Sequence, residues 1–255
     1  IATKQEVKVN FFTDFSGEPT TEHVQLAIQQ FQACGADCIV ALGGGTPIDL
    51  GKAVAVLSKN KHLSIQQLHL QKNLHRYPLI AIPTTAGTGS EVTKVTVITD
   101  PSTNRKYNPS HHRFIPDIAI LDPELTISLP KNITAQTGMD ALAHAMEAYV
   151  STLANPFSDF FALEAIKLIS TYLQKAYEEP DNLEAREGML RGSYFAGVAF
   201  SNASTNLAHA TARPLGTRFQ LSHGLSVALT LPPVIEYGYH SAEKRYEEIA
   251  KVIGT

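Results

Sequence analysis

Short apolar runs alternate with amphipathic segments through the first half of the chain. A continuous apolar run such as residues 37–42 (DCIVAL) is typical of a strand buried on both faces of a parallel sheet. The runs lie at residues 7–12, 37–42, 79–83, 94–99 and 118–121. Between them, residues 20–33 and 47–57 carry apolar residues at helical spacing. Strands alternating with helices predict an α/β domain with a doubly wound parallel sheet.

The pattern changes after the dipeptide Asp122-Pro123, and helical periodicity dominates from there on. The predicted helices cover residues 132–151, 157–178, 182–201, 203–212, 222–236 and 241–253. Prolines and glycines mark their ends, at Asn155-Pro156, Pro180-Asp181, Pro214-Leu215-Gly216 and Gly238. We therefore predict an α/β domain over residues 1–127 and an all-helical domain over residues 128–255. A doubly wound domain usually has more strands before such a glycine turn, so we expect both domains to lack elements at their outer ends.

Composition narrows the class of protein. The chain has 255 residues, 18% of them charged, and a formal net charge of −3, which leaves no basic surface for nucleic acid. No apolar run approaches the roughly 20 residues that a membrane span needs, and residues 1–6 are too polar for the core of a secretory signal. Two cysteines cannot make a disulfide framework. We therefore expect a cytoplasmic protein that acts on a small molecule.

Two loops at strand ends carry residue types that bind phosphate. Gly43, Gly44 and Gly45 follow one apolar run and lead into a helix, whose free N–H groups and positive dipole end favour an anion. Residues 83–91 (PTTAGTGSE) follow the next strand and offer hydroxyls to a diphosphate or a ribose. Each loop alone is equally well explained as a turn. Two of them at the carboxyl ends of strands in one sheet predict a nucleotide cleft.

The helical half carries a candidate metal site. Asp140 and His144 are four residues apart, which places both on one face of a helix. His209 and His223 follow later in the chain. One carboxylate oxygen and three imidazole nitrogens suit a divalent transition metal with a position left open for substrate. Spacing alone does not join the four, because each also has an ordinary explanation as a surface pair or a satisfied polar residue.

Taken together, these segments resemble the iron-dependent (group III) alcohol dehydrogenases. The matching segments follow the family's order through almost the whole chain: ALGGGTPIDLGK (41–52), IPTTAGTGSEVT (82–93), PDIAILDPELT (116–126), GMDALAHAMEAYVS (138–151) and LAHATARPLGTRFQLSHG (207–224). The resemblance implies an α/β nucleotide-binding domain with a Rossmann-like sheet, followed by an all-α metal-binding domain. Members of the family are usually longer at both ends.

The resemblance also implies roles for single residues. Asp140, His144, His209 and His223 would hold the metal, which is Fe2+ in the family, although the same ligands suit Zn2+ and other divalent ions. The cofactor would be NAD, with NADP as the alternative. The residues that match the family's cofactor-binding motifs are Gly43, Gly44, Gly45, Thr46, Asp49, Lys52, Thr84, Thr85, Thr88 and Lys106. Without the resemblance, Asp49 reads as a charge in the first turn of a helix and Lys52 as a solvated lysine.

The expected reaction is reversible hydride transfer between NAD(P) and a small alcohol or aldehyde, with the metal as Lewis acid. One position departs from the family. Arg213 stands where many members have a second histidine, four residues after the third metal ligand. An arginine stays protonated and cannot shuttle a proton, but it can grip an anionic substrate in a bidentate contact. A structural arginine before Pro214 is the alternative.

Other functions remain open at this point. One is a lyase or synthase of the dehydroquinate-synthase type, in which the nicotinamide is reduced only transiently; another is a glycerol-dehydrogenase-like enzyme. A third is a non-catalytic binder of a nucleotide or a metal. Net formation of reduced cofactor with an alcohol would separate a dehydrogenase from the synthase, and tight cofactor binding without turnover on any alcohol would favour the binder. We also expect a homodimer, the commonest assembly among soluble enzymes.

Overall fold

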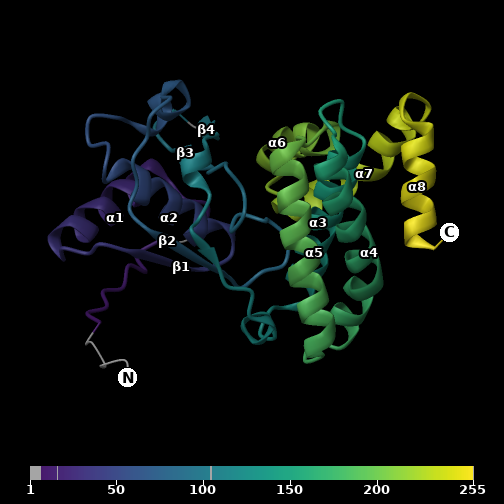
Figure 1. The fold of residues 1–255 in the computed structure, drawn as a ribbon, viewed down its shortest axis with the longest axis horizontal. Coiled ribbons are helices and arrows are strands. Elements are labelled where there is room, and N and C mark those ends of the chain that lie inside the picture. Colours follow the sequence, from purple (N-terminus) through teal and green to yellow (C-terminus); the bar gives the residue numbers. More distant parts are fainter. Residues whose placement is uncertain (1–6, 16, 104, 255) are drawn as a thin grey trace.

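The structure is a computed structural model that describes residues 7–15, 17–103 and 105–254. One part is built around a small parallel sheet, and the other is a bundle of helices (Figure 1). The predicted fold class, an α/β part followed by an all-helical part, is confirmed. The domain boundary at residues 127 and 128 stays a prediction, and the first long helix of the bundle begins at Lys131. The polar start, residues 1–6, lies outside the described residues.

A three-stranded parallel sheet forms the centre of the α/β part, in the order β1-β2-β5. Its strands are β1 (Ile39–Gly43), β2 (Leu79–Pro83) and β5 (Ile118–Ala119). Helix α1 (Thr21–Ala33) precedes β1 and helix α2 (Gly45–Leu57) follows it. The described residues also contain short 3-10 helices, namely η1 (Ile65–Leu70), η2 (His112–Phe114) and η3 (Pro123–Thr126) before the bundle and η4 (Tyr239–Ser241) within it.

The sheet is covered unevenly. Leu79 and Ala81 of the central strand are fully buried beneath α2, as a parallel strand should be. Val40 and Leu42 of β1 are more than half exposed, at 58% and 55%. The prediction of burial on both faces is therefore wrong for β1. The reason is that successive side chains alternate between faces, and no element within the described ranges covers the second face.

Two predicted strands differ from the structure. Residues 7–12 do not form a strand, because their backbone pairs with no strand of the described chain and Val7 and Phe11 are about four-fifths exposed. Within residues 94–99, only the end takes part in a ladder, where β3 (Ile98–Asp100) pairs antiparallel with β4 (Arg105–Tyr107). The start of that run makes only an isolated antiparallel bridge, between Val95 and Ser110, and the Thr96 hydroxyl ties it to α2 by donating to the Asp49 carbonyl oxygen at 2.8 Å.

Six helices form the second part of the molecule, and small side chains let them pack closely. They are α3 (Lys131–Tyr149), α4 (Pro156–Glu178), α5 (Leu183–Asn202), α6 (Leu207–Phe219), α7 (His223–Gly238) and α8 (Glu243–Ile253). Fully buried alanines fill the contact between α3, α4 and α5, among them Ala141, Ala143, Ala165 and Ala196. Among the described helices, none is both long enough and apolar enough to span a membrane.

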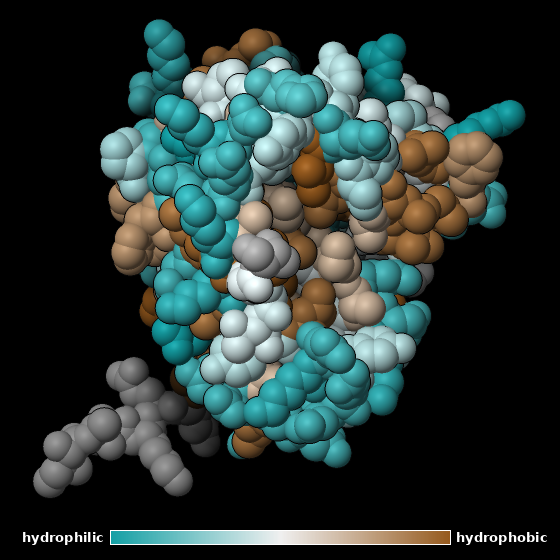
Figure 2. Space-filling model, turned by 90° about the vertical axis from the view of Figure 1, so that its right-hand side faces the viewer, coloured by the Kyte–Doolittle hydropathy of each residue, from teal (hydrophilic) through white to brown (hydrophobic). Residues whose placement is uncertain are grey.

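The outer side of the bundle is not uniformly polar. Figure 2 shows this side, where apolar side chains are visible in a hollow surrounded by hydrophilic ones. The helices and their connections carry large apolar residues that are more than half exposed, including Leu153, Phe157, Phe160, Leu229 and Tyr237.

The predicted helix break at Pro214-Leu215-Gly216 is wrong. Helix α6 continues through Pro214 and ends only at Gln220, which adopts a left-handed conformation with φ 54°. A proline removes one backbone N–H, but it does not end a helix whose next turns remain bonded. The predicted start at residue 203 is also too early, because Asn206 caps the helix by accepting the Leu207 N–H.

The loop after β2 packs directly against the bundle. A Cβ atom on Gly87 would lie 2.6 Å from the Cβ atom of Thr137 on α3. A Cβ atom on Gly89 would lie 2.8 Å from the Cα atom of Gly197 on α5. Only glycine permits these approaches. They bring the hydroxyl-rich loop to α3 within one turn of Asp140.

Candidate metal centre and cofactor cleft

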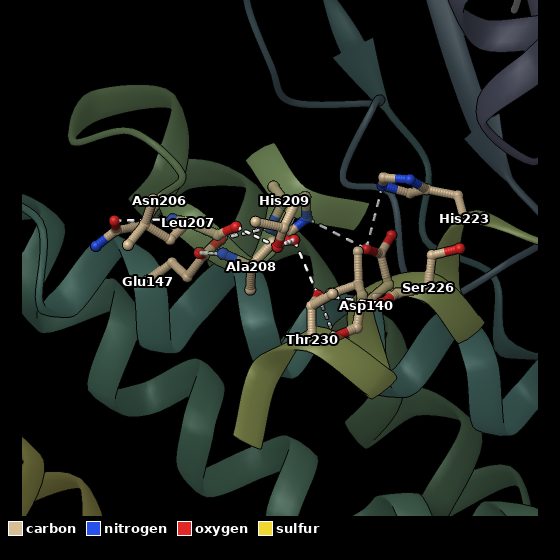
Figure 3. Close-up of polar contacts among 11 residues, drawn as sticks. Asp140, Glu147, Asn206, Leu207, Ala208, His209, His223, Ser226 and Thr230 are labelled. Atoms are coloured by element: carbon tan, nitrogen blue, oxygen red, sulfur yellow. Dashed lines mark hydrogen bonds and ion pairs between the residues drawn. The ribbon is translucent and has the colours of Figure 1, made fainter. Parts of the chain in front are cut away.

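Three helices bring a carboxylate and two imidazoles together. Asp140 lies in the middle of α3, His209 near the start of α6, and His223 is the first residue of α7. One ligand atom from each lies within 4.8 Å of the others. Asp140 Oδ1 is 3.3 Å from His209 Nε2 and 3.5 Å from His223 Nε2, so the carboxylate stands between the two rings (Figure 3).

Close backbone packing places His223 at this point. A Cβ atom on the next residue, Gly224, would lie 2.4 Å from the backbone oxygen of Gln136 on α3. The Ser222 hydroxyl also donates to the Gln136 side-chain oxygen at 2.7 Å. The start of α7 is therefore fixed against α3 one turn before Asp140. The His223 side chain keeps 49% exposure, whereas Asp140 and His209 are buried, so the centre opens on the His223 side.

His144 lies beside this group but outside its set of three ligand atoms. Its ring is buried and stacks on the His209 ring, with centroids 4.2 Å apart and an angle of 19° between the planes. On its other side it stacks on Phe200. Its part as a fourth metal ligand stays a prediction.

Unpaired buried atoms test whether these residues fit a metal. Asp140 Oδ1, His144 Nδ1 and His209 Nε2 are all buried and make no hydrogen bond. Leaving a buried polar atom without a partner costs about 1–3 kcal/mol, and a divalent ion held by the three converging residues would give Asp140 Oδ1 and His209 Nε2 a partner. One carboxylate and several imidazoles form a ligand set suited to iron or zinc. The residues present therefore fit a divalent transition metal.

The charges of the group also suit a metal. Burial opposes ionisation of Asp140, but the nearby imidazoles of His144, His209 and His223 outweigh it and lower its pKa to about 2. Burial lowers the pKa of His144 to about 3. Asp140 is thus an anion and His144 neutral, the forms that bind metal. Burial also lowers the pKa of His209, but the Asp140 and Glu147 carboxylates raise it to about 9, so a metal must displace a proton there.

The glycine turn and the loop after β2 lie side by side. In the parallel register Gly43 is opposite Pro83, and the Thr84 N–H donates to the Gly43 carbonyl oxygen at 2.9 Å. Cβ atoms added to Gly44 and Gly45 would come within 3.3 and 3.0 Å of the Thr85 and Thr88 side chains. The two loops thus form one surface at the carboxyl edge of the sheet.

This surface offers donors without partners. Gly44 caps α2 with no side-chain hydrogen bond, so the first N–H groups of the helix are open to an anion. Thr85 Oγ1 is buried and makes no hydrogen bond. Both features fit a bound diphosphate, and the cofactor contacts of Gly43 to Gly45, Thr84, Thr85 and Thr88 stay predictions. Thr46, also predicted to touch cofactor, donates its hydroxyl to the Gly17 carbonyl oxygen at 3.0 Å.

Asp49 and Lys52 are engaged inside the protein. Lys52 is fully buried; its Nζ donates to the Val95 carbonyl oxygen at 2.7 Å and lies 3.6 Å from Asp49 Oδ1. The Asp49 carboxylate accepts the Val97 N–H at 2.8 Å and the Ser90 hydroxyl. The interpretation of Lys52 as a solvated lysine is wrong. The pair joins the start of α2 to the segment after the second loop, and its contact with cofactor stays a prediction.

Glu91 completes the buried cluster around Lys52, and sequence reasoning missed it. The residue is only 3% exposed, and burial raises the pKa of its carboxyl to about 7, although its backbone N–H and the Lys52 charge oppose this. In the unfolded chain the usual pKa is 4.5. The folded protein therefore holds more protons than the unfolded chain between these pH values, and its stability falls as the pH rises through about 7.

We predict that Glu91→Gln removes this part of the pH dependence. A shift from 4.5 to about 7 corresponds to about 3 kcal/mol at about 1.4 kcal/mol per pH unit. The free energy of unfolding of the variant, relative to the parent, should rise by about that amount from about pH 5 to about pH 8. Urea denaturation across this range measures it. A difference between the two proteins that does not change with pH would contradict the assignment.

Two further positive charges lie near the open side of the metal centre. Lys106 on β4 donates to Glu18 Oε1 at 2.5 Å on the surface. Burial is the main cause of the lowered pKa of His223, and the charges of Lys106 and Arg213 add to it. Arg213 follows His209 by one turn on α6. Both charges therefore act at His223, and a contact of Lys106 or Arg213 with a ligand stays a prediction.

Comparisons with known proteins decide the family. A family model described as iron-containing alcohol dehydrogenase matches residues 1–123, and one described as the C-terminal part of the Fe-containing alcohol dehydrogenase family matches residues 134–255. The chain belongs to the iron-containing alcohol dehydrogenase family. Within this family, the 1-propanol dehydrogenase PduQ of Salmonella typhimurium is 42% identical over 97% of this chain and 64% of its own length.

Solved structures of the family agree in fold. A crystal structure of 1,3-propanediol oxidoreductase superposes with a TM-score of 0.92 at 37% identity, covering 96% of this chain and 64% of that one. Sulfoacetaldehyde reductase from Bifidobacterium kashiwanohense in complex with NAD+ gives a TM-score of 0.84 at 35% identity, covering 96% and 70%. Of the curated relative PduQ, the chain spans less than two thirds of the full length.

Proposed function

We propose that this chain forms the cofactor cleft and metal centre of an NAD(P)- and metal-dependent alcohol dehydrogenase. One observation carries the proposal. Asp140, His209 and His223 converge, Asp140 Oδ1 and His209 Nε2 are buried without a hydrogen bond, and the loop beside the glycine turn packs on α3 one turn away. A metal centre next to a dinucleotide cleft is suited to hydride transfer between a nicotinamide and a small alcohol or aldehyde. The substrates named for PduQ and 1,3-propanediol oxidoreductase are small alcohols, which supports this substrate class.

Asp140, His209 and His223, with His144 as the predicted fourth ligand, would hold the ion. When bound, a divalent metal supplies Lewis-acid stabilisation of the negative charge on the alcohol or carbonyl oxygen. The chain's own residues provide the orientation. The N-terminus of α2 and the hydroxyls of Thr84 and Thr85 would hold the cofactor diphosphate and ribose, and the Gly87 contact with Thr137 fixes their distance from Asp140.

The proposed cofactor is NAD, with NADP as the alternative, and the proposed metal is Fe2+, with Zn2+ as the alternative. The NAD+ complex of sulfoacetaldehyde reductase favours NAD over NADP as the first cofactor to test. The family name favours Fe2+, and the ligand set also admits Zn2+. The cytoplasmic location stays a prediction. The homodimer also stays a prediction, which sedimentation analysis of the complete protein would test.

The test is turnover by the complete protein after chelation and reloading. Metal-free protein should not form NADH from NAD+ and 1-propanol, and addition of Fe2+ under anaerobic conditions should restore it. Zn2+ and NADP+ serve as matched alternatives in the same assay. Tight NAD+ binding without turnover on any short alcohol, diol or hydroxy acid would favour a non-catalytic binder. Release of a product without net NADH would favour a lyase or synthase.

The position of Arg213 leads to a prediction about the charge of the substrate. We propose that its guanidinium contacts an acidic group of the substrate near His223, where its charge already acts. Removing a charge-assisted hydrogen bond costs about 1.5–3 kcal/mol, so Arg213→Ala should raise KM for a hydroxy acid about 10-fold or more and leave KM for 1-propanol within about twofold. Steady-state kinetics on both substrates measure this. Equal effects on the two would remove the role.

A further inference from the structure

Glu147 lies on the same face of α3 as Asp140 and His144, seven and three residues further along the helix. Its side chain is only 2% exposed. It does not belong to the group of ligand atoms that lie within 4.8 Å of one another. A buried carboxylate outside the metal ligands needs an explanation, because an anion is buried only where specific partners compensate for the lost hydration.

Two contacts supply those partners, and both lead to the start of α6. Glu147 Oε2 lies 2.5 Å from His209 Nδ1. Glu147 Oε1 accepts the N–H of Ala208 at 2.6 Å, one of the helix N–H groups that lack a partner inside the helix (Figure 3). The two carboxylate oxygens thus contact the backbone of Ala208 and the side chain of His209 at the same time.

The chemistry of the pair fixes which nitrogen of His209 faces the metal centre. An ionised carboxylate is an acceptor only, so a neutral His209 must carry its proton on Nδ1. The lone pair is then on Nε2, which is buried without a hydrogen bond and lies 3.3 Å from Asp140 Oδ1. Thr230 of α7 strengthens the arrangement, since its hydroxyl donates to the Ala208 carbonyl oxygen at 2.9 Å.

We propose that Glu147 is a positioning residue that presents His209 Nε2 to the divalent ion and thereby sets the affinity for metal. It acts through His209 and touches neither substrate nor cofactor. Carboxylates that orient a metal-binding histidine in this way typically change metal affinity or activity 10- to 100-fold when replaced. The inference rests on the proposed metal centre, and the experiment separates the two.

The diagnostic variant is Glu147→Gln, which keeps the shape of the side chain. A glutamine offers one acceptor and one donor group, so it cannot accept from both Ala208 and His209. If its oxygen keeps the Ala208 N–H, its amide donates to Nδ1 and favours the proton on Nε2, where the metal should bind. We expect the dissociation constant for Co2+, measured by equilibrium titration of the complete metal-free protein, to rise roughly 10- to 100-fold.

Three further measurements distinguish the proposed role from a purely structural one. The visible absorption bands of bound Co2+ report the coordination geometry and should change in Glu147→Gln. Glu91→Gln is the matched control, since Glu91 is equally buried but contacts no proposed ligand, and its Co2+ affinity should stay within about twofold of the parent, well short of the 10- to 100-fold expected at Glu147. Glu147→Asp keeps both acceptor oxygens and should bind Co2+ more tightly than Glu147→Gln.

The outcomes separate the claims. Unchanged Co2+ affinity and spectrum in Glu147→Gln, with normal binding by the parent, would overturn the inference alone. If Glu147→Gln does not fold, Glu147→Asp decides: its carboxylate is one methylene shorter, so weaker Co2+ binding with a changed spectrum in a folded protein would support the inference, whereas parent-like affinity with an unchanged spectrum would contradict it. A parent chain that binds no Co2+ would overturn the proposed metal centre and this inference with it.

Discussion

Replacement of Asp140 by Ala is expected to abolish metal retention and to lower kcat/KM for a small alcohol by roughly a thousandfold. Asp140 Oδ1 is the atom shared by both close contacts, at 3.3 Å to His209 Nε2 and 3.5 Å to His223 Nε2. Without it, no carboxylate remains in the group, and the ion loses its only anionic ligand. A metal contributes several kcal/mol to stabilisation of the transition state, and each 1.4 kcal/mol is about tenfold in rate.

Metal analysis after anaerobic purification and steady-state assays measure both effects. Asp140→Asn tests the charge at nearly constant shape and should lose metal as well. Asp159→Asn is the matched control, because Asp159 lies on a helix of the same bundle and pairs with Arg245 at 2.9 Å, away from the proposed ligands. Full metal content and activity in Asp140→Ala would contradict the proposed centre.

Gly89→Ala should destabilise the protein by about 3 kcal/mol. Gly89 has φ +61°, which costs a residue with a side chain about 1–2 kcal/mol. Its new Cβ atom would also lie 2.8 Å from the Cα atom of Gly197, and backbone cannot move aside as a side chain can. Overpacking of this kind costs typically 1–3 kcal/mol more. The loop would then separate from α5, so we also expect weaker binding of NAD+.

Gly35→Ala separates backbone strain from overpacking. Gly35 has almost the same φ, +66°, but nothing lies within 4 Å of an added Cβ atom. It should therefore cost only the backbone strain, about 1–2 kcal/mol, and leave NAD+ binding unchanged. Urea denaturation and equilibrium binding of NAD+ measure both variants. Equal losses of stability in Gly89→Ala and Gly35→Ala would show that the contact with Gly197 does not hold the loop.

Local patterns in the sequence were sufficient to predict many of the helices and strands. Residues 79–83 form β2 as predicted, and every predicted helix other than α6 lies within two residues of its predicted ends, because apolar periodicity and caps such as Asn155-Pro156 are local signals. One failure involves partners far away in the chain: residues 7–12 have the composition of a strand, but no strand of the described chain lies beside them. The other failure is local, because Pro214 removes only one backbone N–H and α6 continues through it to Phe219.

The convergence of three candidate ligands could be predicted from the sequence, whereas the residues that support them could not. Motif order joined Asp140, His209 and His223, which spacing alone could not, and the structure brings these three together. Lys52 looked solvated because its partners, Val95 and Asp49, meet only in the folded chain. Glu147 had one readable signal, its position on the helical face of Asp140 and His144. Its partner lies 62 residues away, beyond any local pattern.

Anomalous diffraction at the iron edge from crystals of the complete protein loaded with Fe2+ is the most direct test of the central claim. The account predicts one strong peak between Asp140 Oδ1, His209 Nε2 and His223 Nε2, with His144 close enough to be the fourth ligand. A metal peak elsewhere in the molecule, or full occupancy of iron with these side chains turned away from it, would contradict it.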